Sequence, residues 1–129
     1  MPFFLTEKGK TDNNYFEEGK ILFLKKDYSK AKFKFEKDIV FNPKNENSYL
    51  YLAKIHKKEN QSELAESNFK TVILLDPMNE EAVYELSLLS LKKSNFEEAK
   101  KLIKKFGIIC KKNCKNKELL NSKLKDSLK

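Results

Sequence analysis

Apolar side chains recur at helical spacing through the middle of the chain. In residues 46–59, Tyr49, Leu52, Ala53 and His56 stand at i, i+3, i+4 and i+7, which places them on one face of a helix. Residues 62–75 repeat this pattern with Leu64, Ala65, Phe69, Val72 and Ile73. The segment 60–62 separates the two, and Ser62 is expected to N-cap the second helix. The two segments therefore predict a hairpin of helices.

Prolines mark where the helical patterns end. Asn42-Pro43 and Asp76-Pro77 each stop a pattern, because the residue before proline avoids the α region. Together with the spacing they predict helices near residues 12–25, 28–41, 46–59, 62–75, 80–93 and 96–110. The chain holds only three Gly and three Pro, fewer turn formers than an all-β fold uses. The sequence therefore predicts an all-α protein.

The pattern itself repeats with a period of 34 residues. The matching columns are Tyr15/Tyr49, Gly19/Ala53/Ser87, Ala31/Ala65/Ala99, Phe35/Phe69 and Pro43/Pro77. Self-similarity at a fixed period is typical of repeat proteins. The small residues are expected to face each other where the helices of a hairpin cross, Ala31 against Gly19, Ala65 against Ala53 and Ala99 against Ser87.

This period and these columns resemble the tetratricopeptide repeat (TPR) family, whose signature runs aromatic, Leu, small residue, Tyr, Ala, aromatic, Pro. The resemblance implies an all-α, right-handed superhelix of three TPR helix hairpins. The hairpins would span 12–45, 46–79 and 80–113, after an N-terminal extension at 1–11. The chain departs from the signature at several positions: Glu18, Asp38, His56, Val83, Ser90 and Lys111. Terminal repeats are expected to be atypical.

A further helix is predicted near residues 116–128, within a basic segment at 114–129. Leu119, Leu120, Leu124 and Leu128 alternate there with charged residues. Because a stack of repeats leaves an apolar face at its end, we expect this helix to cover Leu102, Phe106 and Ile109 as a C-terminal cap. The alternative is a free basic helix lying on a membrane.

Charge is concentrated in the same region. The chain has 129 residues, which is long enough for one domain. It carries a net charge of +8, and all 27 basic residues are lysines. Residues 100–129 hold a net +9, since eleven lysines face only Glu118 and Asp126. Without arginine for bidentate recognition, we expect no specific nucleic-acid binding. A weak tether to an anionic surface through this segment remains an alternative function.

The chemistry-bearing residues do not indicate an enzyme. The only histidine, His56, falls in a packing column, and no nucleophile motif or Gly-rich phosphate loop is present. Cys110 and Cys114 are expected to be unbridged thiols, with a bridge or a metal site shared with another chain as alternatives. We expect no cofactor and no metal. No apolar run approaches the roughly 18 residues of a membrane span, and the N-terminus lacks the basic region of a secretion signal. These features favour a cytoplasmic location. The alternative is that the chain is a domain of a longer or exported protein.

The resemblance also implies a binding surface, because in TPR folds the first helix of each hairpin lines a concave groove that receives peptides. The groove residues would be Asn13, Phe16, Glu17, Lys20 and Phe23 from the first unit, Asn47, Leu50, Tyr51, Lys54 and Lys57 from the second, and Glu81, Tyr84, Glu85 and Leu88 from the third. They lie off the packing stripe, so we expect them to be exposed.

The expected function is a non-enzymatic protein–protein interaction module that binds a segment of a partner. Chaperone-binding TPR domains hold a C-terminal carboxylate with a clamp of Lys, Asn, Asn, Lys and Arg. Here those positions carry Phe16, Lys20, Tyr51, Glu81 and Glu85, so capture of an acidic tail is not expected. The alternative is homo-oligomerisation, through the first unit or through Phe3-Phe4-Leu5.

Overall fold

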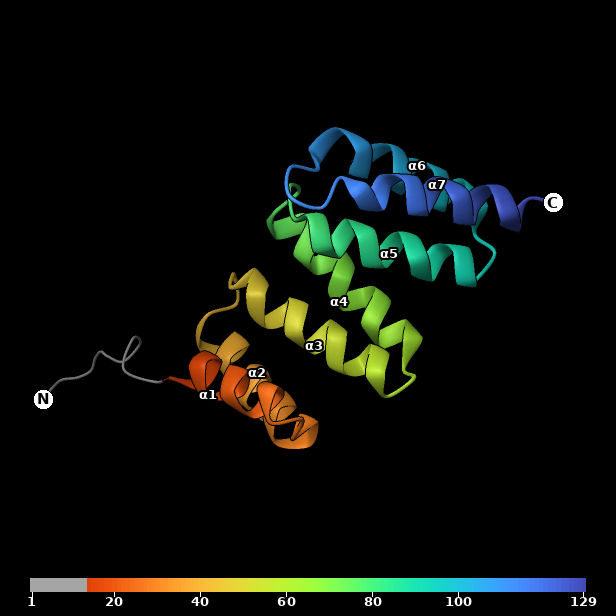
Figure 1. Cartoon of the computed structure of the whole chain (residues 1–129). Coiled ribbons are helices and arrows are strands. Elements are labelled where there is room, and N and C mark those ends of the chain that lie inside the picture. The colour runs from red at the N-terminus through yellow and green to blue at the C-terminus, as the bar shows by residue number, and fades with distance from the viewer. Residues whose placement is uncertain (1–13) are drawn as a thin grey trace, which may run out of the picture.

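The computed structural model describes residues 14–129, and over these residues the chain is helical throughout (Figure 1). The helices are α1 (Tyr15–Leu24), α2 (Tyr28–Phe41), α3 (Glu46–Lys58), α4 (Ser62–Leu75), α5 (Glu80–Lys92), α6 (Phe96–Ile109) and α7 (Lys115–Ser127). These bounds confirm the predicted helices to within a few residues. None of the described helices is both long and apolar enough to cross a bilayer.

Consecutive helices pair into three hairpins, α1/α2, α3/α4 and α5/α6, which stack in chain order (Figure 1). Each second helix also contacts the first helix of the next hairpin. At the end of the stack α7 packs against both α5 and α6. Its Leu120 is fully buried in one cluster with Leu102, Phe106 and Ile109, so α7 is the predicted C-terminal cap.

The turn inside each hairpin has the same backbone geometry. Lys26, Asn60 and Ser94, spaced at the repeat period, have φ angles of 63°, 60° and 61°. In each turn the next residue donates its N–H to a carbonyl five residues back, as from Asp27 to Leu22 at 2.9 Å. This closure satisfies helix-end carbonyls through a left-handed residue.

The small-residue columns are buried as predicted. Ala31, Ala53, Ala65, Ser87 and Ala99 have no exposed surface. Gly19 was expected to face Ala31, but its nearest neighbour is Phe35. A Cβ placed on Gly19 would lie 2.7 Å from Cε1 of Phe35. The aromatic ring of the repeat signature therefore uses the space that the missing side chain leaves.

One detail of the helix prediction is wrong. Ser62 is the first residue of α4 rather than its cap, and Gln61 occupies the cap position without a side-chain hydrogen bond. The Gln61 Oε1 instead lies 2.9 Å from Nδ1 of the buried His56.

The two cysteines, expected as unbridged thiols, form a disulfide that joins the residue directly after α6 to the residue directly before α7. The short segment between Cys110 and Cys114 brings their Cα atoms to 5.2 Å. Glu80 of α5 accepts hydrogen bonds from the backbone N–H groups of Asn113 at 3.2 Å and Lys112 at 3.4 Å. Burial raises the pKa of Glu80, but these backbone hydrogen bonds outweigh it and hold the pKa below its ordinary value.

Candidate partner-binding groove

The expected groove residues of α1 and α3 form an aromatic cluster. The Tyr51 ring stacks on Phe35 at 4.9 Å between centroids, and it meets Phe23 edge-on at 5.0 Å. Phe16 lies 6.0 Å from Tyr51 and 5.9 Å from Phe35. Phe16, Phe23 and Tyr51 are half-buried, whereas Phe35 is fully buried. One edge of this cluster is thus core and the other is accessible to a partner.

Lysine side chains lie over the accessible edge. The Lys54 ammonium stands 5.1 Å from the centre of the Tyr51 ring and 5.6 Å from that of Phe23. Lys20 stands 5.1 Å from the centre of Phe16 and pairs with Glu17 of its own helix at 3.3 Å. These cation–π contacts are favourable even at exposed sites, so they fix both side chains over the cluster.

Between α3 and α5 the groove is ionic instead. Lys54 pairs with Glu81 at 2.9 Å, and Lys57 pairs with Glu85. The two carboxylates were expected to repel an incoming acidic group, but each of them is already matched by a lysine of the preceding hairpin. The candidate groove residues therefore form an apolar half at α1 and α3 and a charge-compensated half at α3 and α5.

The remaining expected groove residues differ in their exposure. Leu50 is 7% exposed and belongs to the core, so the expectation that it lines the groove is wrong. Tyr84 is half-buried against Phe106, with ring centres 5.9 Å apart. Asn47 is exposed as expected. Asn13 lies outside the described residues.

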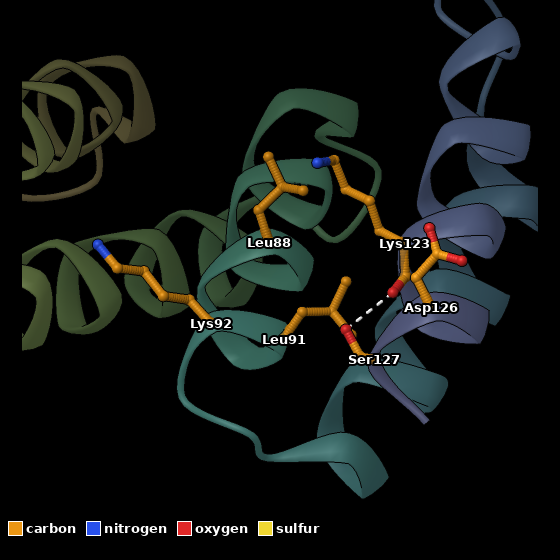
Figure 2. Close-up of a pocket in the computed structure, with 6 residues that line it drawn as sticks. All are labelled: Leu88, Leu91, Lys92, Lys123, Asp126 and Ser127. Carbon is orange, nitrogen blue, oxygen red and sulfur yellow. Dashed lines mark hydrogen bonds between the residues drawn. The ribbon is translucent and has the colours of Figure 1, made fainter. Parts of the chain in front are cut away.

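Leu88 lines a different hollow, between the C-terminal halves of α5 and α7. Figure 2 shows Leu88 and Leu91 of α5 beside Lys123, Asp126 and Ser127 of α7, with Lys92 extending away from α7. The hollow has a volume of about 510 Å³ and is open to solvent. Its presence follows from the cap, because α7 lies beside α5 where a further repeat would stand. The position of Leu88 in the sequence could not show whether it faces the candidate groove or this hollow beside α7.

The fold is that of the TPR domains. The first TPR domain of Spaghetti (RPAP3), solved with an HSP90 peptide, superposes with a TM-score of 0.78 at 19% identity, over 88% of this chain and 90% of that one. The type III secretion chaperone SycD of Yersinia enterocolitica, solved with a peptide of the translocator YopD, gives 0.78 at 16% identity, over 94% and 95%. A chain of the CopN–Scc3 complex gives 0.70 at 20% identity, and this chain spans 66% of its length. No family model and no curated protein matches the sequence.

Proposed function

We propose that this chain is a non-enzymatic interaction module whose concave groove binds a segment of another protein. Peptide complexes are known for two of the structures that share its fold, the Spaghetti domain with an HSP90 peptide and SycD with a YopD peptide. The observation that carries the proposal here is the half-buried aromatic cluster of Phe16, Phe23 and Tyr51 beside paired charges. Aromatic anchors surrounded by polar groups are common at protein interfaces.

The two halves of the groove favour a segment of mixed character. Apolar side chains of the partner would cover the accessible edges of Phe23 and Tyr51. Partner groups of both signs can exchange with the Lys54–Glu81 and Lys57–Glu85 pairs without leaving a charge unmatched. A segment carrying only carboxylates would have to displace Glu81 and Glu85 from their lysines. An amphipathic segment with both charges is therefore the preferred ligand.

The test is a charge swap that keeps the groove folded. Lys54→Glu with Glu81→Lys retains an ion pair between α3 and α5 but inverts its direction, and no aromatic residue is removed. Wild-type and swapped chains serve as paired baits in a native lysate, with bound proteins identified by mass spectrometry. The expected result is a protein retained by the wild type and lost from the swapped chain.

The matched control is the same swap at another pair that joins successive hairpins. Lys93 and Glu66, 2.7 Å apart, link α4 to the end of α5 away from α3. Glu66→Lys with Lys93→Glu should retain every partner of the wild type. Equal eluates from wild type and the Lys54/Glu81 swap would reject groove binding, provided that circular dichroism shows both chains folded.

Self-association is the second candidate, and the exposure of the first hairpin favours it. Of the eleven large hydrophobic residues that are exposed in the described chain, five belong to α1 and α2: Ile21, Leu24, Phe33, Val40 and Phe41. Leu24 is 80% and Val40 is 74% exposed. Light scattering should then give a mass above the monomer, reduced by Leu24→Ser with Val40→Ser. A monomer at every concentration would reject this candidate. The Phe3-Phe4-Leu5 segment lies outside the described residues.

A further inference from the structure

The lysines of α6 and α7 differ from those of the hairpin stack in their partners. In the stack, five lysines bridge to acids outside their own helix, as Lys34 does to Glu18 at 2.8 Å and Lys32 to Glu59 at 3.2 Å. Of the eleven lysines at 100–129, only Lys100 and Lys129 have a carboxylate of the described residues within ion-pair distance, each at 3.7 Å. Within the described residues, most lysines of this segment therefore form no ion pair.

Three of these lysines converge at the seam where α6 and α7 lie against each other (Figure 1). Lys100 and Lys104 of α6 and Lys117 of α7 line an open hollow of about 390 Å³. Gly107 permits this approach, because a Cβ placed on it would lie 3.0 Å from Cε of Lys117. The Lys117 stem thus lies close over the α6 backbone.

An apolar side chain stands among these charges. Ile108 lines the same hollow and is 75% exposed. Positions 97, 100, 101, 104 and 108 share one face of α6, so Ile108 projects from a face that carries Lys100, Lys101 and Lys104, with Glu97 paired to Lys100 at its start. We call Lys100, Lys104, Lys117 and Ile108 the α6–α7 surface. An exposed apolar group surrounded by lysines is the pattern of a peripheral bilayer contact.

We propose that the α6–α7 surface docks on an anionic lipid bilayer, a function beyond that of the groove. Its lysines would lie at the level of lipid phosphates, and Ile108 would enter the boundary of the acyl region. Lysine ammonium groups near an anionic leaflet each add to binding, and the contribution is screened by salt. The alternative of a free basic helix does not apply, because α7 is packed as the cap and the surface is built from both helices.

Nucleic acid phosphates could pair with the lysines of the α6–α7 surface, but nucleic acid would make no favourable contact with Ile108. Single-stranded nucleic acids stack their bases on exposed aromatic rings. The only aromatic residue at 100–129 is Phe106, which is fully buried. Specific base readout commonly uses arginine, and the chain contains none. The exposed apolar side chain of the surface, Ile108, is aliphatic, which suits lipid better.

The test is co-sedimentation of the full chain with vesicles of phosphatidylcholine alone or mixed with an equal part of phosphatidylglycerol. The expected result is binding to the mixed vesicles only. The triple variant Lys100→Glu, Lys104→Glu and Lys117→Glu should weaken binding by about tenfold or more. The matched control Lys25→Glu, Lys44→Glu and Lys92→Glu alters the net charge equally at exposed positions elsewhere and should bind as the wild type does, within about twofold.

A second variant separates lipid insertion from simple attraction. Ile108→Ser leaves the charge unchanged and should weaken vesicle binding by a few-fold, while binding of a DNA duplex stays as in the wild type. Equal losses from the triple variant and its control would overturn the site, because binding would then follow net charge alone. Wild-type binding by Ile108→Ser, or binding to the duplex but not to vesicles, would overturn docking on lipid. None of these variants touches the groove, so failure here leaves the proposed function intact.

Discussion

The junction between the first and second hairpins and the junction between the second and third use the same backbone arrangement with different chemistry. At the first, the Asp38 carboxylate is 2% exposed and accepts hydrogen bonds from Ser48 at 2.6 Å, Asn45 at 2.8 Å and Asn42 at 2.9 Å. At the second, the residues one repeat later are Val72 and Ala82, both fully buried in the aliphatic core.

The difference shows that the repeat fixes geometry and leaves the chemistry of each junction open. A buried carboxylate is stable at the first junction because three neutral donors surround it. The second needs no donors, since Val72 and Ala82 are apolar. A buried carboxylate with its donors is stable, and so is a pair of apolar residues. A buried carboxylate among apolar residues, or donors without the carboxylate, is not. Exchanging residues between the junctions therefore tests how much of the stability lies in matched partners.

A second pair of equivalent positions shows the same independence. Lys32 pairs with Glu59 at 3.2 Å, and one repeat later Glu66 pairs with Lys93 at 2.7 Å, with the two charges exchanged. The ion pair is kept at both positions, but the hairpin that supplies the lysine and the hairpin that supplies the glutamate are exchanged. The direction of this bridge is thus not dictated by the fold, which is why a swap at Glu66 and Lys93 serves as a control for the groove.

The largest effect is expected from placing the first junction's carboxylate in the second. Val72→Asp would bury a charge without equivalents of the Ser48 and Asn42 donors, and it should lower the free energy of unfolding by about 3–5 kcal/mol in urea titrations. Adding Ala82→Ser and Asp76→Asn supplies the equivalents of Ser48 and Asn42 and should recover much of that loss. A Val72→Asp chain as stable as the wild type would mean that water reaches this position.

The reverse change, Asp38→Ala, leaves the Ser48 hydroxyl and two amides without their acceptor. It should cost about 2–3 kcal/mol, less than Val72→Asp because Asn42 and Asn45 can turn to water. The control is the double variant with Ser48→Ala, which removes the most buried donor. Its cost should be smaller than the sum of the two single costs, and strict additivity would show that the two side chains are not coupled.

The sequence predicted the fold well because a repeat presents its packing pattern several times. The columns of Ala31, Ala65 and Ala99 each mark a helix crossing, and all are buried as expected. The sequence showed that Asp38 departs from the repeat signature. It did not show why a carboxylate is tolerated there, because the hydrogen-bond donors come from the following loop and helix. The disulfide was predicted only as an alternative to unbridged thiols, because two cysteines four positions apart have no preferred pairing state from sequence alone.

The groove was predicted less completely for a related reason. Helical spacing places Leu50 near Tyr51 on the first helix of the second hairpin, yet only Leu50 is turned into the core. Tyr84 is half-buried against Phe106 of α6, whereas Leu88 lies beside α7, which is a partner of α5 outside the repeat. The pairing of Lys54 with Glu81 could have been anticipated, since opposite charges recur 27 positions apart, as they do at Lys32 and Glu59.

A smaller effect is expected at the bridge of the second junction. Hydrogen bonds from Lys93 and then Lys70 hold the pKa of Glu66 below its ordinary value, against the opposing effect of burial. A lowered carboxyl pKa adds stability that is present above the ordinary pKa and is lost as the pH falls through the lowered one. Glu66→Gln should therefore cost about 0.2–1 kcal/mol at neutral pH, with both side chains in contact with water.

This cost should vanish in acid, where the wild-type carboxyl is protonated as well. Thermal melts of both chains, from neutral pH down to pH values below the lowered pKa of Glu66, should show the two stability curves converging. The matched control is Glu63→Gln on the same helix, which forms no ion pair in the described chain. A gap between wild type and Glu66→Gln that persists at low pH would assign the effect to packing rather than charge.

The smallest effect concerns the turns, where the hairpins agree in geometry but not in residue type. Lys26 and Ser94 adopt a left-handed conformation that costs most residues about 1 kcal/mol or more, whereas Asn60 tolerates it better. Replacement by glycine relieves this strain but adds freedom to the unfolded chain, so Lys26→Gly should gain only about 0.5 kcal/mol and Asn60→Gly close to nothing. The neighbouring Lys25, with φ of −82°, provides the control, because Lys25→Gly relieves no strain and should lower the melting temperature. If Lys26→Gly were as unstable as Lys25→Gly, the first turn would not share the left-handed geometry of the other two.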